Sequence, residues 1–182
     1  MRKTFFLLFL VMTIRSSAQN NDYIISMDGI GAIKLGMSQP ELEKLLNKKI
    51  PLTNPTDSVS GSWQDSAKIN YKGMNLELDF QRNYFAPDTF NMIIIGIRTS
   101  SPLCKTKNGI GIGTDKLKII AAYEDHFLTI EPGFVNYYYT EPSKTKSTVS
   151  ILDDSRHTMI RFFLFNKKLV SFLVKTSFSD SE

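Results

Sequence analysis

Residues 74–80 read Met-Asn-Leu-Glu-Leu-Asp-Phe, with an apolar side chain at every second position. Because successive side chains of a β-strand point to opposite faces, this alternation predicts a strand with one buried and one wet face. Lys72-Gly73 stands directly before it and is typical of a tight turn, which pairs the strand antiparallel with residues 67–71. An antiparallel sheet with one solvent-facing side is therefore the basis of the predicted fold.

The rest of the chain supplies more strands and one long loop. Residues 51–66 are rich in Pro, Ser, Thr and Asp and are predicted to form the loop. Gly96 lies inside a β-branched run, where we expect a β-bulge. Further strands are predicted at 22–27, 90–99, 128–139, 147–152, 158–165 and 169–176.

The first predicted helix begins at Ser38. Glu41 follows three residues later, which is the spacing of a capping box, and Pro40 falls in the first turn, where its missing N–H costs nothing. The helix is expected to end at residues 47–49, ahead of Pro51. Its buried stripe is predicted to consist of Leu35, Leu42, Leu45 and Leu46.

A second helix is predicted after Gly113, capped by Thr114 or Asp115 and apolar through Tyr123. The segment around Gly36 aligns with the one around Gly113 at an offset of 77 residues. In each, an apolar strand end is followed by a glycine, a capping residue and a helix. This self-similarity predicts two copies of one helix-plus-sheet unit.

The first helix entry resembles that of a known group of proteins. Residues 33–42, Ile-Lys-Leu-Gly-Met-Ser-Gln-Pro-Glu-Leu, are similar to the I-x-L-G-M-[ST]-x-x-[EQ]-[VL] entry of the β-lactamase-inhibitory-protein and BamE (SmpA/OmlA) group. Residues 113–123 resemble a degenerate second copy. Members of that group are exported bacterial proteins that act as scaffolds or inhibitors rather than enzymes, and the resemblance implies the same class here. BamE-type members are lipoproteins, whereas Gln19 stands where an anchoring Cys would be.

The first eighteen residues have the order of a secretory signal peptide. Arg2 and Lys3 form a basic start, an apolar run follows at 5–14, and small residues precede a cut after Ala18. A transmembrane span is the alternative, but this run extends only about 15 Å as a helix, against roughly 30 Å of hydrocarbon. We therefore expect an exported protein of the periplasm or the extracellular space.

The charge of the chain excludes one class of partner. Without the three basic residues of the leader, 19 basic residues stand against 18 acidic ones. Nucleic-acid binding requires clustered positive charge, and Lys144 and Lys146 are interpreted as part of a solvated turn. We expect no nucleic-acid partner and no transmembrane segment after the leader; another envelope protein fits better.

No cofactor or metal is predicted. Two histidines and one cysteine are too few for a dedicated structural zinc site. Residues 109–113, Gly-Ile-Gly-Ile-Gly, lack the spacing of a dinucleotide fingerprint. Cys104 has no disulfide partner, and an inert, partly buried thiol is favoured over one activated by Lys105.

Two functional hypotheses remain open. In the first, Arg161, Phe163 and Phe165 lie on the wet face of a strand and form a binding surface together with Tyr137 and Tyr139. In the competing interpretation these aromatic residues belong to the core.

The second hypothesis is a small hydrolase or ligand-binding protein that uses His157 with Asp153 or Asp154. No nucleophile-elbow motif supports the hydrolase, and these residues are close neighbours in a predicted turn. No catalytic residue is therefore assigned.

The sequence thus predicts an α+β protein of two similar units, each a helix packed on antiparallel strands. Residues 1–18 form the signal peptide, 19–107 the first unit and 108–182 the second. With 42% hydrophobic and 22% charged residues the composition is that of a globular protein. The expected function is non-enzymatic binding or scaffolding in the bacterial cell envelope.

Overall fold

The computed structural model describes residues 21–52, 64–82, 92–135 and 141–177. This part of the chain is mostly β, with 56% of it in strands and 14% in helices. Seven strands form a large sheet in the spatial order β4 (Gln64–Tyr71), β5 (Met74–Arg82), β6 (Met92–Thr99), β11 (Lys168–Thr176), β10 (Thr158–Phe165), β9 (Pro142–Asp153) and β8 (Phe127–Phe134). Neighbouring strands of this sheet are antiparallel.

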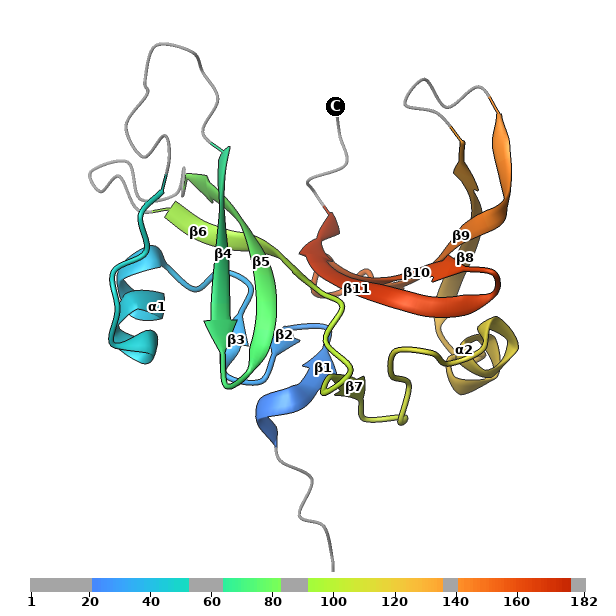
Figure 1. Cartoon of the computed structure of the whole chain (residues 1–182), viewed down its shortest axis with the longest axis horizontal. Helices are drawn as coiled ribbons and strands as arrows, with labels where there is room; N and C mark the ends of the chain where they lie inside the picture. The colour runs from blue at the N-terminus through green and yellow to red at the C-terminus, as the bar shows by residue number, and fades with distance from the viewer. Residues whose placement is uncertain (1–20, 53–63, 83–91, 136–140, 178–182) are drawn as a thin grey trace, which may run out of the picture.

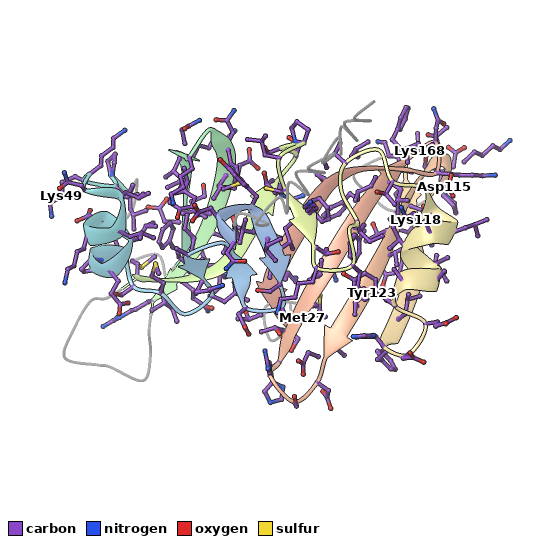
Figure 2. All side chains as sticks on the ribbon, turned by 90° about the horizontal axis from the view of Figure 1, so that it is seen from below. Met27, Lys49, Asp115, Lys118, Tyr123 and Lys168 are labelled. Atoms are coloured by element: carbon purple, nitrogen blue, oxygen red, sulfur yellow. The ribbon has the colours of Figure 1, made fainter. Side chains whose placement is uncertain are left out.

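A small sheet and two short helices complete the fold. The small sheet has the order β3 (Ile33–Lys34), β2 (Gly29–Ile30), β1 (Ile24–Ser26) and β7 (Lys105–Thr106), and the 3-10 helix η1 (Asn21–Tyr23) precedes β1. The helices are α1 (Gln39–Leu46) and α2 (Lys116–Ala122). Figure 1 shows all of these on one side of the large sheet, which curves away from them. From below, α1 with Lys49 lies at one end, α2 with Lys118 at the other, and the small sheet between them (Figure 2).

The hydrophobic core fills the space between these two layers. Period-2 alternation places one set of side chains from each strand in it, as in β5, where Leu76, Leu78 and Phe80 are fully buried. Leu42 of α1 and Ile119 of α2 enter the same core. The opposite face of the large sheet, which we call the open face, is covered by none of the described helices or small-sheet strands.

Two hairpin turns of the large sheet, one of them predicted at Lys72-Gly73, have the backbone of tight two-residue turns. Lys72 and Gly73, between β4 and β5, both have positive φ angles of 50° and 82°. Asn166 and Lys167, between β10 and β11, have φ angles of 48° and 64°. Such turns match the right-handed twist of the paired strands. The predicted bulge is present as well, because the β5–β6 register shifts next to Gly96.

The two helices start in the same way. Gly36 has a φ of 80° and donates its N–H to Ile94 O, while Gly113 has a φ of 86° and donates to Leu169 O. In return Ile94 N and Leu169 N donate to the carbonyl one residue after each glycine. Each entry is therefore fastened to a strand of the large sheet by the same pair of backbone hydrogen bonds.

The capping residues are those predicted from the sequence. Glu41 accepts hydrogen bonds from both the backbone N and the Oγ of Ser38, at 2.8 and 2.7 Å. Asp115 accepts from Leu117 N at 3.0 Å. α1 ends at Asn47, whose φ of 49° is left-handed.

The predicted fold class is wrong. The chain does not form two units in which a helix covers its own sheet, because β6 pairs with β11 and joins the strands of both halves into one seven-stranded sheet. The helices have only eight and seven residues and cover little of it. The two-residue strands β2 and β7 were not predicted, since they are too short to show a period, whereas β3 lies where a strand end was expected before Gly36. Leu45, assigned to the buried stripe, is 41% exposed. The boundary between residues 107 and 108 stays a prediction.

Candidate functional site

The open face is the side of the sheet opposite the core. Along β10, Ile160, Phe162 and Leu164 are buried in the core, so Arg161 and Phe163 point to the open face. In register across neighbouring strands, Arg161 lies opposite Leu173 of β11, which lies opposite Arg98 of β6. The predicted orientation of β10 is therefore confirmed.

A hollow of about 780 Å³ lies on this face. Its charges are divided between two sides. Asp79 of β5 supplies a carboxylate, whereas Arg161 of β10 and Lys175 of β11 supply cations, with Arg98 of β6 between them. Asp65 of β4 also lines the hollow, but it pairs in register with the buried Phe80, so its side chain is on the core face of the strand. The remaining lining residues are Gln64, Ser66, Phe80, Ile95, Gly96, Phe163 and Leu173.

Arg98 is the central side chain of this surface. Its guanidinium carbon lies 4.9 Å from the centroid of the Phe163 ring, a cation–π distance. Its Nε lies 3.8 Å from a carboxylate oxygen of Glu77, which also pairs with Lys68 at 2.9 Å. Arg98 also lines a neighbouring hollow of about 530 Å³ that contains Asn75 and Ser171. The Arg98 guanidinium can therefore present donors to a ligand while its charge lies over an aromatic ring.

Asp79 is held in an unfavourable place for a charge. Burial raises the pKa of its carboxyl above the ordinary value, although Arg98 and, more weakly, Lys175 oppose the shift, while Glu77 adds to it. Gly96 makes the position possible, because a Cβ at Gly96 would lie 2.9 Å from Asp79 Oδ2. The half-buried carboxylate lies directly over the backbone of β6.

We expect Asp79→Asn to stabilise the protein at neutral pH. The folded-state pKa of Asp79 is raised, so the native state binds this proton more tightly than the unfolded state, and stability falls as pH rises through that pKa. The amide carries no charge, and its advantage should shrink toward zero as the pH falls below the unfolded value of about 3.9. Urea unfolding of both proteins at pH 7 and pH 3 measures this. A variant less stable than wild type at pH 7 would show that the contacts of Asp79 with Arg98 and Lys175 outweigh its burial.

A buried hydroxyl adds to the polar groups of this face. Ser150 of β9 pairs in register with Arg161. Its Oγ is buried and has no hydrogen-bond partner among the described residues. Buried polar groups normally have one, but this hydroxyl has almost no exposed surface and does not line the hollow.

The structure brings together part of the predicted binding surface. Arg161 and Phe163 line the large hollow, whereas Phe165 lies farther along β10 and is 48% exposed. Tyr137 and Tyr139 lie outside the described residues. Arg98 and Asp79 were not assigned to the site from the sequence. The available signal was the alternation itself, which places Glu77 and Asp79 on the wet face, together with the bulge at Gly96.

The alternative site is a surface turn. His157 is exposed, with a φ of 50°, between β9 and β10. Asp153 accepts hydrogen bonds from Ser155 Oγ at 2.6 Å and from Arg156 N at 3.2 Å. Arg156 is in turn paired with Asp28 at 3.0 Å. The Asp153 carboxylate is thus engaged in holding the turn.

Cys104 belongs to the core. It is fully buried, and its Sγ lies 3.1 Å from Met74 Sδ. Burial raises the pKa of the thiol, which disfavours the reactive thiolate.

The described residues contain no cluster of three or more His, Cys, Asp or Glu side chains that could hold a metal ion. None of the helices in this part of the chain has the length and apolar character needed to cross a membrane.

No family model, curated protein or solved structure matches this chain. The resemblance to the BamE group therefore stays a prediction, and the site is argued from its own residues.

Proposed function

We propose that this chain is an exported, non-enzymatic binding protein of the bacterial cell envelope and that the open face of the large sheet holds its partner. The observation that carries this proposal is the large hollow, where side chains from five adjacent strands meet. Arg98, whose guanidinium lies over the Phe163 ring, is at its centre. Aromatic and arginine side chains dominate the energetics of many protein interfaces.

The division of charge indicates the chemistry of the partner. A partner that fits would present a cationic group toward Asp79 and anionic groups toward Arg161 and Lys175. Such complementarity contributes mainly to specificity and to the rate of association.

Site-specific photocrosslinking in the envelope tests the proposal. A benzophenone amino acid at Phe163 is compared with the same group at Tyr23, an aromatic residue that is also part-buried and that precedes β1 in the opposite layer. We expect a defined adduct from position 163 and none from position 23. Arg98→Ala should lower its yield about fivefold or more, since hot-spot truncations commonly cost over 1 kcal/mol. An adduct common to both positions, an adduct insensitive to Arg98→Ala, or none from position 163 would argue against the open face.

A further inference from the structure

The two edges of the large sheet are protected to different degrees. β4 carries Asp65 and Lys68, and the chain at residues 46–51 lies beside it, lining a hollow together with residues 66–70. β8, at the other edge, carries Glu131 as its single charged residue. No described strand pairs with its outer side. Natural proteins usually shield such edges with charges or covering segments.

The outer strand β8 is also apolar where it is regular. Phe127 is 66% exposed and Ile130 is 47% exposed. Residues 127–132 keep an unbroken register with β9, which then shifts between Pro132 and Phe134. A bulge of this kind ends regular pairing. Residues 127–131 therefore form a short, regular edge in which Glu131 is the single charged residue.

A basic hollow adjoins this edge. It has a volume of about 350 Å³. Four lysines line it: Lys116 of α2, Lys144 and Lys146 of β9, and Lys167 of the β10–β11 turn. Ile130, Glu131 and Pro132 of β8 form another wall. These lysines come from three separate parts of the sequence, so the chain shows no basic run. Lys168, next along, is paired with Asp115 at 3.5 Å, and Figure 2 shows both at one end of α2.

The lysine-bearing segments are fixed to one another by the backbone. Lys116 N donates to Lys167 O at 2.9 Å, and Asn166 N donates to Thr145 O at 2.8 Å. The hollow is thus a feature of the fold rather than of independent loops. Four lysines line it against the single Glu131, so the hollow is basic.

We propose that the 127–131 edge binds an extended acidic segment of a partner protein, which adds to the large sheet as an eighth strand beside β8. Backbone hydrogen bonds along the edge would supply affinity, and the lysines would select carboxylates. A free anion would use the lysines but not the edge. A second copy of this chain, paired edge to edge, would bring two basic hollows together, which like-charge repulsion disfavours.

The probe for the test is a fluorescein-labelled decapeptide of alternating Glu and Val, and the protein lacks residues 1–18 but retains every described residue. We expect anisotropy to show binding in low salt. The double substitution Lys144→Glu with Lys146→Glu should weaken the affinity for the probe about tenfold, because two attractive contacts with its carboxylates become repulsive. The matched control is Lys105→Glu with Lys107→Glu, two exposed lysines of the same spacing on β7 and just after it. The affinity of this control variant for the probe should stay within about twofold of the wild-type value.

Hydrogen exchange tests strand addition separately from charge. Saturating probe should slow amide exchange within 127–131 about tenfold or more and leave β4 unchanged. A peptide of the same length in which two Val are replaced by Pro should lose binding, since Pro cannot pair along a strand. Equal binding of the Pro-containing or of a Lys–Val peptide, unchanged exchange in β8, or equal weakening by the control variant would each overturn the proposal. None of these outcomes bears on the open face.

Discussion

Phe162→Ala is expected to lower the free energy of unfolding by about 3–5 kcal/mol, the usual cost of removing a fully buried Phe. Phe162 lies on β10 with no exposed surface. Its ring centroid is 5.6 Å from that of Phe172 on β11 and 5.7 Å from that of Tyr123 after α2. The substitution therefore opens a cavity between the large sheet and α2. Urea unfolding followed by circular dichroism measures the loss.

The control for this prediction is on the same strand. Phe165→Ala removes the same atoms from a half-exposed position, and we expect a cost of about 1 kcal/mol or less. If Phe162→Ala fails to fold, Phe162→Leu leaves a smaller void and should cost under about 2 kcal/mol. Equal effects at positions 162 and 165 would contradict the assignment of the two faces of β10.

Gly29→Ala is expected to lower the free energy of unfolding by about 3 kcal/mol or more. Gly29 has a φ of 145°, a conformation that only glycine adopts readily. A Cβ there would lie 2.2 Å from the carbonyl oxygen of Ile33 in the paired strand β3. Relief of the clash requires β2 and β3 to separate, which would withdraw Ile30 and Ile33 from the core.

Gly109→Ala is the matched control for Gly29. Gly109 also has a positive φ, 73°, but a Cβ there would meet nothing within 4 Å. Gly109→Ala should therefore lower the free energy of unfolding only by the strain of a left-handed alanine, about 1–2 kcal/mol. Thermal unfolding of both variants compares them. A Gly29 variant no less stable than the Gly109 variant would show that β2 and β3 do not approach each other as described.

Local signals predicted most of the secondary structure. The alternation in residues 74–80 and 158–165 became β5 and β10, and the Ser38–Glu41 pair caps α1 as expected. These features depend on neighbours within four residues or on a strict period, so they are visible in one segment at a time. The alternation also placed Arg161 and Phe163 on the face away from the core.

The long-range arrangement was not visible in the same way. The pairing of β6 with β11, which joins residues 96–99 to 172–175, made one sheet out of two predicted units. Such pairing depends on which edges remain unpaired after local hairpins have formed, and no single segment records that. The hollow on the open face and the basic hollow beside β8 arise in the same way, from side chains of distant segments.

The sequence by itself determined where the long strands, the turns and the helix caps lie and which side of each long strand is apolar, because those properties are set by residues near in the chain. Only the tertiary structure decided that the strands form one curved sheet, that Arg98 rests on Phe163, and that lysines from three segments meet at one edge. The physical reason is that these contacts join residues far apart in sequence, whose meeting is set by packing of the whole core and by backbone pairing between strands.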